Sequence, residues 1–420
     1  MMDVHEYIIE MAKRARAAAC ELARLTTDEK NAALLAMAEA LVAHRDEIAA
    51  ANAQDIEKAK ATGLAPAMID RLTLTDSRFD AMVEGVRHVA NLPDPVGDIL
   101  WTRERPSGIT INKVRVPLGV VAVVFESRPN VFIDTAALCL KTGNAVILRG
   151  GKEAIETNRA LAKAIGELGI ENYELGMKEN SAIPNSSFVI PNSIQLVDIL
   201  DHAAVTELVR AVGLVDVAIP RGGERLIRAM CEAALVPVLK HYKGVCHIYV
   251  DDKADLGMAL SILDNAKTQR PGVCNAAECL LVHEKLAPLF LPMVESWAKD
   301  KGVKLHFPAE EWEREFLSLD INVGIVSDHR AAIEHINRYG SHHSDCIVTN
   351  DGERANEFLR DVDSAAVYHN VSTRFTDGAE FGMGAEIGIS TDKLHARGPM
   401  GLEELTTYKY VVTGDGVVRK

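Results

Sequence analysis

Short apolar runs alternate with longer segments of helical periodicity through much of this 420-residue chain. The runs are apolar throughout, which is typical of strands that are covered on both faces of a sheet. In the first series we expect strands at 118–125, 144–148, 193–197, 215–219 and 236–239, and helices at 130–141, 152–168, 203–212 and 223–234. This alternation predicts a parallel, doubly wound α/β sheet.

A second series of the same kind follows residue 245. Its expected strands are 245–250, 277–282, 323–326, 346–348 and 365–368, and its expected helices are 255–269, 285–299, 330–338 and 353–359. A chain of this length exceeds one ordinary core. We therefore expect two doubly wound domains, with the active site in the cleft between them.

Three stretches lie outside these series. Residues 4–61 and 77–92 show helical periodicity, with a helix start near Thr26. Residues 108–117 have β propensity without a clean core face, which is consistent with an exposed hairpin arm. Residues 405–412 predict a strand with no obvious partner in its own domain.

Composition narrows the compartment and the partners. The seven cysteines are scattered and form no C-x-x-C pair, which argues against a disulfide framework and against a zinc site, so no metal is expected. No apolar run is long enough for export or for a membrane span, and a reducing cytoplasm fits best. The net charge of −14 disfavours nucleic acid, and an anionic ligand would need a local basic cluster.

Cys274 is where we expect the chemistry. The predicted helix before it stops at Pro271 and Gly272, because proline cannot continue a helix and glycine tolerates the turn. Lys267 and Arg270 lie just upstream, and positive charge favours the reactive thiolate. The alternative is that Cys274 is a small buried hydrophobic residue, as most free cysteines are.

Basic residues and glycine pairs follow the strands of the first series. They occur, with acidic and amide neighbours, as Glu126, Arg128 and Asn130; Arg149, Gly151 and Lys152; Arg221, Gly222 and Gly223; and Lys240 and Lys243. Ligands of such sheets bind beyond the carboxyl ends of the strands, and a glycine pair opening a helix offers N–H groups to a phosphate. No G-x-G-x-x-G motif is present, and a solvated loop charge is the alternative for any single residue.

Several unusual strings resemble one family over nearly the whole chain. They are FESRPNV at 125–131, LRGGKE at 148–153, IPRGGE at 219–224, HYKGVC at 241–246, TQRPGVCN at 268–275 and HARGPMG at 395–401. On these the chain resembles the aldehyde dehydrogenase superfamily, and most closely its γ-glutamyl phosphate reductase family.

The resemblance implies three structural parts. They are a nucleotide-binding domain (1–100 and 118–244), an oligomerisation element of hairpin and C-terminal strand (101–117 and 399–420), and a catalytic domain (245–398). The resemblance further implies that Cys274 is the nucleophile and that Asn130 completes an oxyanion hole with the Cys274 N–H. Asn130 also suits a helix N-cap, and both roles could hold at once.

One departure from the superfamily concerns the base that activates water. Where hydrolytic aldehyde dehydrogenases carry a glutamate followed by Leu-Gly-Gly, this chain reads His241-Tyr-Lys-Gly. The water-activating glutamate is missing. This suits a thioester that is reduced and not hydrolysed.

The resemblance thus leads to NADPH-dependent reduction of L-glutamyl 5-phosphate to L-glutamate 5-semialdehyde in proline biosynthesis, through a Cys274 thioester. Arg149, Gly151, Lys152, Arg221, Gly222 and Gly223 would bind the cofactor, with NADP favoured over NAD because Arg149 and Lys152 suit a 2′-phosphate. Glu126, Arg128, Lys267 and Arg270 are the candidates for substrate contacts. A CoA-acylating aldehyde dehydrogenase and a non-catalytic scaffold remain alternatives.

The expected partners follow from the same resemblance. We expect a cytoplasmic homo-oligomer, either a dimer or a tetramer, with functional coupling to the glutamate kinase that precedes it in the pathway.

Overall fold

The computed structural model describes residues 3–166 and 192–419. The chain divides into two compact units, each with its own parallel sheet. The first unit comprises Met1–Leu239, Met383–Gly388 and Met400–Lys420, and the second comprises Lys240–Gly382 and Ile389–Pro399. Among the described residues no helix combines the length and the apolar character that crossing a membrane requires.

The sheet of the first unit has four parallel strands in the order β5-β4-β3-β6. The strands are β3 (Val120–Phe125), β4 (Ala145–Arg149), β5 (Ile194–Leu196) and β6 (Val217–Arg221). The chain runs outward from β3 through β4 to β5 and then returns to β6 on the other side of β3. The carboxyl ends of β3 and β6 therefore form a topological switch point, the usual ligand position in such sheets.

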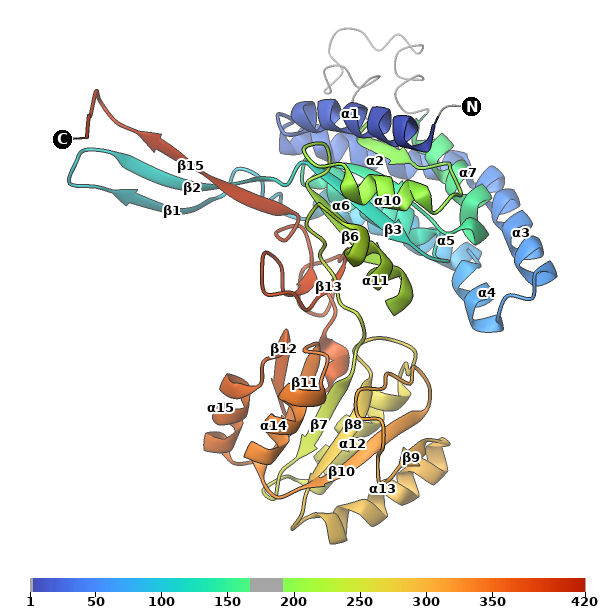
Figure 1. Ribbon diagram of the computed structural model, residues 1–420, viewed down its shortest axis with the longest axis vertical. Coiled ribbons are helices and arrows are strands. Elements are labelled where there is room, and N and C mark those ends of the chain that lie inside the picture. Colours follow the sequence, from blue (N-terminus) through green and yellow to red (C-terminus); the bar gives the residue numbers. More distant parts are fainter. Residues whose placement is uncertain (1–2, 167–191, 420) are drawn as a thin grey trace. The chain divides into compact units, whose positions relative to one another are not determined.

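Helices cover both faces of this sheet (Figure 1). The segments are α1 (Val4–Leu22), α2 (Thr27–Ala43), α3 (Arg45–Ala61), α4 (Pro66–Leu72), α5 (Asp76–Asn91), α6 (Asn130–Lys141), η1 (Lys152–Ala154), α7 (Ile155–Gly166), α10 (Ala203–Arg210) and α11 (Glu224–Ala233). Thr26 caps α2 together with Glu29, as the pattern near Thr26 indicated.

Two predictions for the first series need comment. The strand predicted at 236–239 is wrong, because only Val238 pairs there, through a single bridge to Ala218. The helix predicted at 152–168 begins as the 3-10 turn η1 and continues as α7, and its last two residues lie outside the described residues.

An antiparallel sheet of three strands extends from the first unit (Figure 1). It contains β1 (Ile99–Glu104), β2 (Thr110–Pro117) and the C-terminal β15 (Thr406–Thr413). The predicted C-terminal strand finds its partner here, since β15 pairs with β2 over its full length.

The second unit has six parallel strands in the order β12-β11-β7-β8-β10-β9. They are β7 (Cys246–Val250), β8 (Ala277–His283), β9 (Lys304–His306), β10 (Asp320–Val326), β11 (Ser344–Val348) and β12 (Ala366–His369). The helical segments are α12 (Leu256–Thr268), α13 (Ala287–Lys301), α14 (His329–Tyr339), α15 (Gly352–Asp361) and η2 (Thr373–Phe375), and the short strands β13 (Gly388–Ser390) and β14 (Gly398–Met400) pair with each other. The short edge strand β9 was not predicted.

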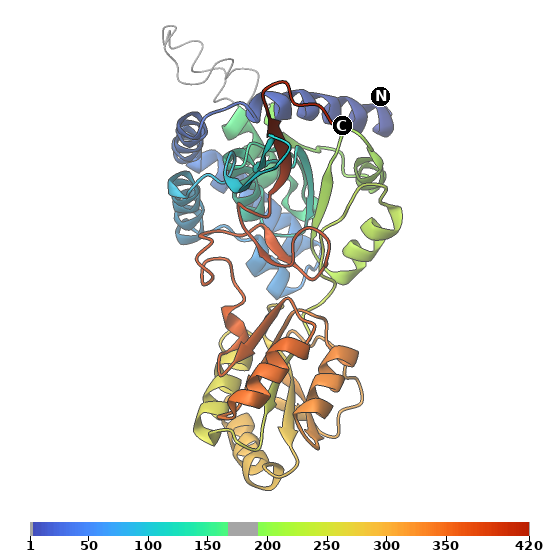
Figure 2. The same cartoon turned by 90° about the vertical axis from the view of Figure 1, so that its left-hand side faces the viewer.

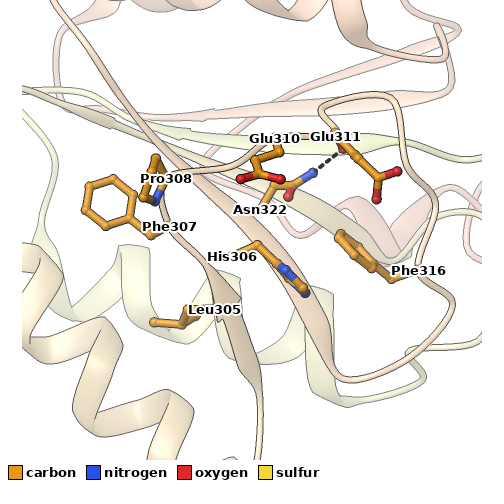
Figure 3. A pocket seen from close by; sticks show the side chains of 8 residues that line it. All are labelled: Leu305, His306, Phe307, Pro308, Glu310, Glu311, Phe316 and Asn322. Carbon is orange, nitrogen blue, oxygen red and sulfur yellow. Dashed lines mark hydrogen bonds between the residues drawn. The ribbon is translucent and has the colours of Figure 1, made fainter.

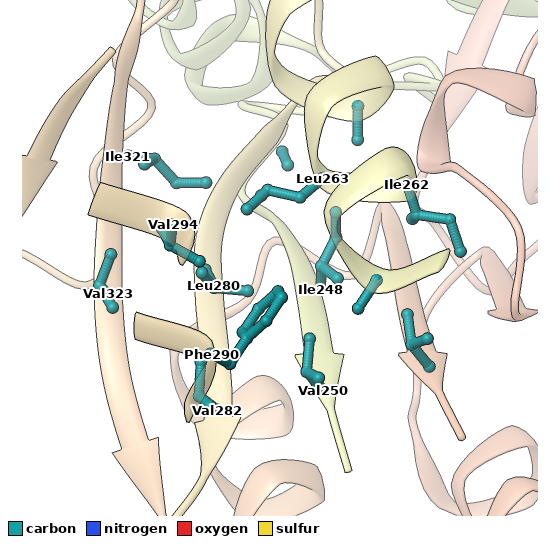
Figure 4. Close-up of a cluster of buried hydrophobic side chains, with 14 of the residues drawn as sticks. Ile248, Val250, Ile262, Leu263, Leu280, Val282, Phe290, Val294, Ile321 and Val323 are labelled. Carbon is teal, nitrogen blue, oxygen red and sulfur yellow. The ribbon is translucent and has the colours of Figure 1, made fainter. Parts of the chain in front are cut away.

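Alternating side chains divide the core of the second unit into two layers. Ile248 and Val250 of β7 pack with Leu263 of α12 and Phe290 of α13 (Figure 4), whereas Tyr249 packs on the opposite face with residues of α14 and α15. Successive strand residues point to opposite faces, so one apolar strand serves both layers. Figure 2 shows α14 and α15 lying together over one face of the sheet.

Phe290 tests this core. Truncation by Phe290→Ala should lower the free energy of unfolding by about 3–5 kcal/mol, because the ring is fully buried and its loss leaves a cavity. Adjacent Leu289 on the same helix is 62% exposed, and Leu289→Ala should change stability by less than about 0.5 kcal/mol. Urea denaturation measures both, and equal losses would contradict the assignment of the two faces of α13.

Candidate active site

Cys274 lies in the loop that joins α12 to β8. It is half-buried, whereas Cys139, Cys246, Cys279 and Cys346 are buried. The alternative that Cys274 is merely a core residue is therefore disfavoured. Its sulfur lies at the edge of the core, where a reactant can approach.

Asn275 fastens the Cys274 loop to the segment around η2. Its side-chain amide donates to the carbonyl oxygen of Thr376 at 2.8 Å, and its own carbonyl oxygen accepts a hydrogen bond from Thr373 Oγ1 at 2.7 Å. Asn275 is only 4% exposed. The residue next to the thiol is thus held on both its backbone and its side chain.

Gly244 allows the backbone of Cys274 to come close. A Cβ at position 244 would lie 1.8 Å from the Cys274 carbonyl oxygen, so no other residue fits without moving the loop. The same carbonyl oxygen accepts a hydrogen bond from Cys246 Sγ at 3.2 Å. The strand entry at 244–246 and the Cys274 loop therefore form one packed unit.

Two histidines accompany the thiol. One ring nitrogen each of His241 and His343 and the Sγ of Cys274 all lie within 4.8 Å of one another. His241 Nδ1 donates to the carbonyl oxygen of Ile389 at 2.7 Å, which makes Nε2 the basic nitrogen of the neutral ring. Burial, followed by the charge of His241, lowers the pKa of His343 to about 3, so His343 is neutral at physiological pH.

The position of His241 changes the interpretation of the missing glutamate. The water-activating carboxylate is absent, and an imidazole nitrogen lies within 4.8 Å of the Cys274 sulfur. His241 was not selected as a site residue from the sequence, although the HYKGVC string contained it. His343 carried no sequence signal.

Arg374 brings positive charge to the thiol, and Arg270 lies near Arg374. Arg374 on η2 donates to Gln269 Oε1 at 2.7 Å and also to the side chain of Asn275. Burial, then the like charge of exposed Arg270, lower the pKa of Arg374, while the charge of Cys274 opposes them. Arg374 was missed because a hundred residues separate it from the loop that it binds.

Lys267 does not occupy the predicted position for a substrate contact. Its ammonium group is fully buried and lies 2.9 Å from Glu278, which is also fully buried. Burial lowers the pKa of Lys267 and raises the pKa of Glu278 to about 7. The pair joins the end of α12 to β8, so it holds the two ends of the Cys274 loop together.

Two cavities lie in the second unit. The larger, of about 600 Å³, adjoins the Cys274 loop, and its lining comprises Ser261, Ile262, Asn265, Gln269, Asn370, Val371, Ser372, Arg374, Phe375, Asp377 and Glu380. The other, of about 320 Å³, is lined by His306 stacked on Phe316 and by Glu310 and Glu311 (Figure 3). The smaller cavity has these two carboxylates and no Lys or Arg in its lining, which disfavours a phosphate, whereas the larger has Arg374 beside Asp377 and Glu380.

In the first unit the switch point brings Glu126 and the glycine pair together. Glu126 Oε2 accepts a hydrogen bond from Gly223 N at 2.9 Å, where α11 begins. Glu126 thus takes the place that a phosphate was predicted to occupy at this helix terminus, and its predicted contact with substrate competes with this bond. A Cβ on Gly222 would also collide with the Glu126 carboxylate.

Arg149 points into the protein. It is 7% exposed, and its guanidinium donates to the carbonyl oxygens of Gly150 at 3.1 Å and Leu200 at 3.0 Å. Burial lowers its pKa. The predicted phosphate contact of Arg149 is not supported, whereas Lys152 is exposed and Gly151 precedes it at the start of η1.

Asn130 is the first residue of α6 and bonds within that helix. Its amide Nδ2 donates to Asp134 Oδ2 at 2.8 Å. The alternative of an N-cap is wrong, because Pro129 takes that position. Burial raises the pKa of Asp134 to about 6, although the Asn130 hydrogen bond and the charge of Arg221 lower it.

The predicted site residues thus fall into two groups. Half-buried Arg128, Asn130 and Arg221 belong with Glu126 to the first unit, and Cys274 and Arg270 belong to the second. The proposed oxyanion pair of Asn130 and Cys274 remains a prediction. Within the second unit the thiol, two imidazoles and two guanidinium groups converge at the amino ends of β7, β8 and β11.

Comparison with known proteins gives a consistent result. The model of the aldehyde dehydrogenase family matches residues 3–306. A γ-glutamyl phosphate reductase of Desulforamulus reducens is 50% identical, with 97% of this chain and 98% of the relative covered. The crystal structure of γ-glutamyl phosphate reductase from Thermotoga maritima is 44% identical and superposes with a TM-score of 0.92 over 98% of this chain and 100% of that chain. An acetylating aldehyde dehydrogenase of Geobacillus thermoglucosidasius, 17% identical with a TM-score of 0.66 over the full length of both chains, shares the fold.

Gly244 provides a test of the Cys274 loop. Gly244→Ala should slow alkylation of Cys274 by iodoacetamide at least tenfold, because the new methyl group displaces the Cys274 carbonyl. Gly272 in the same loop has only a backbone oxygen at 3.7 Å from its would-be Cβ, so Gly272→Ala is the matched control. Mass spectrometry of the labelled peptide measures both rates, and an unchanged rate in Gly244→Ala would contradict the packing.

Asp134 predicts a pH-dependent stability. Since its pKa is about 6 in the folded protein and 3.8 in the reference state, ionising it in place destabilises the fold as pH rises through this window. Asp134→Asn should therefore be more stable than the natural chain by up to about 3 kcal/mol above pH 6, with the difference vanishing below pH 4. Chemical denaturation at several pH values measures this, and a difference that grows toward acid would refute it.

Proposed function

The chain belongs to the aldehyde dehydrogenase family, and we propose that it reduces L-glutamyl 5-phosphate to L-glutamate 5-semialdehyde and phosphate through a thioester on Cys274, using NADPH. The family makes it an oxidoreductase. Relatives at 50% and 44% identity that bear the name γ-glutamyl phosphate reductase support the substrate and hence a place in proline biosynthesis. The half-buried thiol beside His241, with Arg374 close enough for its charge to interact with that of the thiol, is the observation that carries the proposal.

The first step is attack of the Cys274 thiolate on the acyl carbon. His241 takes the thiol proton, since one of its ring nitrogens lies within 4.8 Å of the sulfur. Phosphate leaves as the C–S bond is retained, and Arg270 and Arg374 supply the positive charge that stabilises it. Gln269 and Arg374, which are hydrogen-bonded to each other, also line the large cavity of the second unit, although Cys274 itself does not.

Asn130 and the backbone N–H of Cys274 are proposed to hold the oxyanion. Asp134 accepts one amide hydrogen of Asn130 and so orients the other toward the ligand. An oxyanion donor of this kind contributes about a hundredfold or more in rate. Asp134 thus acts through Asn130 as a positioning residue.

The switch point of the first unit fits a nucleotide. The connections of β3 and β6 lead to opposite sides of the sheet at this point. Exposed Lys152 is available to a phosphate, and Gly222 and Gly223 permit close backbone approach. Binding at the start of α11 requires Glu126 to release Gly223. When bound, NADPH supplies the hydride that reduces the thioester, after which Cys274 is free to react again.

The three-stranded sheet is proposed to join subunits. Its strands expose several large apolar side chains, namely Ile99, Leu100, Tyr408, Tyr410 and Val412, each at least 41% exposed. Such a surface is unusual on a lone chain and suits a homo-oligomer. Coupling to glutamate kinase and a cytoplasmic location remain predictions.

Nicotinamide reduction in the reverse direction tests the reaction. With glutamate 5-semialdehyde, NADP and phosphate, the natural chain should reduce NADP, Cys274→Ser should show no covalent turnover, and Asn130→Ala should be about a hundredfold slower or more. Cys231 is another half-buried cysteine, and Cys231→Ser is the control that should retain the full rate.

The acceptor separates the alternatives. Turnover that requires CoA in place of phosphate would identify a CoA-acylating aldehyde dehydrogenase. An unchanged rate in Cys274→Ser, or none in the natural chain, would contradict the thioester mechanism.

A further inference from the structure

A second group of chemically active side chains lies inside the second unit and takes no part in the proposed mechanism. It consists of His247 on β7, Cys279 on β8 and His335 on α14. One ring nitrogen from each histidine and the Sγ of Cys279 lie within 4.8 Å of one another. His247 and Cys279 are fully buried. The group therefore sits between the sheet and the helix that covers it.

The two histidines leave polar atoms unsatisfied. Nε2 of His247 and Nε2 of His335 are both buried and have no hydrogen-bond partner of ordinary geometry within the described part of the chain, although Cys279 interacts with the His247 ring and raises its pKa. Buried polar atoms are almost always paired, and an unpaired one indicates an ion or water that the chain itself does not supply. Two such atoms in one cluster with a thiol indicate a shared ligand.

The other nitrogen of His247 is already fixed. His247 Nδ1 lies 2.8 Å from Asp345 Oδ1, and the same carboxylate accepts hydrogen bonds from the His247 backbone N–H at 2.8 Å and from the Ser364 hydroxyl. A carboxylate bonded to one imidazole nitrogen is the arrangement that orients a metal-binding histidine and leaves Nε2 to the metal.

The ring of His335 is also held in place. Its centroid lies 4.5 Å from that of Trp312, edge to face, and 4.8 Å from that of Tyr339. Aromatic contacts with these two side chains restrict the ring. Both imidazoles are thus oriented before any ligand arrives.

We propose that His247, His335 and Cys279 bind one divalent cation of the zinc class between β7, β8 and α14. Two imidazoles and one thiolate are a ligand set that zinc prefers, with water in the fourth position. Ligand atoms of a tetrahedral zinc ion lie about 3.5 Å apart, so separations of up to 4.8 Å need to shorten by at most about 1.3 Å.

Protonation of the His247 ring is the alternative to metal binding. Burial lowers the pKa of His247, but Cys279 and Asp345 outweigh burial and raise it to about 10. A protonated ring would pair with Asp345 and exclude a cation. Direct metal binding distinguishes the two.

The Cys274 cluster offers a second thiol with two histidines, so the experiment removes it. The full-length Cys274→Ser variant is freed of metal with a chelator and titrated with Co²⁺, and then with Zn²⁺. We expect one Co²⁺ per chain with a thiolate-to-cobalt charge-transfer band and visible bands of tetrahedral cobalt, displacement by Zn²⁺, and a melting temperature that rises with Zn²⁺. The readouts need no activity, so their outcome is separate from that of the proposed function.

Further variants in the same background locate the ion. Cys279→Ser should abolish the charge-transfer band, and His335→Gln should weaken Co²⁺ binding at least tenfold. His329 on the same helix pairs with Glu357 instead, and His329→Gln should leave binding unchanged. If Cys279→Ser does not fold, the comparison of His335→Gln with His329→Gln decides. Absence of Co²⁺ binding, or a band that survives in Cys279→Ser, would overturn the proposal.

Discussion

The close contact between the Cys274 backbone and Gly244 is the constraint on which the site depends. Because the Cys274 carbonyl packs where a side chain at 244 would be, the backbone of Cys274 is held against the entry of β7. The Lys267–Glu278 pair beneath the loop and the Asn275 bonds beside it keep that contact from opening. The proposed roles of the histidines and arginines depend on these contacts, which hold the Cys274 loop in place.

The candidate site residues lie at opposite ends of the strands in the two parallel sheets. In the first unit the candidate ligand residues follow the carboxyl ends of β3, β4 and β6, as the switch point of a doubly wound sheet predicts. In the second unit the thiol cluster precedes β7, β8 and β11 at their amino ends. Each loop of the thiol cluster leads directly into a buried strand, and that strand fixes the position of the loop's side chains.

The basic residues of the chain differ in whether they are available to bind an anionic ligand. The chain carries a net charge of −14, yet two of its candidate phosphate ligands are used inside the protein, Lys267 in a buried ion pair and Arg149 on backbone carbonyls. In the second unit Arg374, which carried no motif, lies close enough to Arg270 for their like charges to interact. A buried cation needs a partner and a surface cation does not, so the pairing partners, more than the number of basic residues, decide which remain available.

Local pattern determined much of this protein. Continuous apolar runs predicted both parallel sheets, because a strand covered on two faces must be apolar throughout, and the Pro-Gly break placed Cys274 in a loop. Local pattern did not predict burial or long-range contacts. It missed the inward orientation of Lys267 and Arg149, the single bridge in place of a strand at 236–239, and the grouping of His241, Cys274 and His343. Those features depend on which segments pack together. Contacts between residues a hundred positions apart are set by the tertiary structure and not by the local sequence.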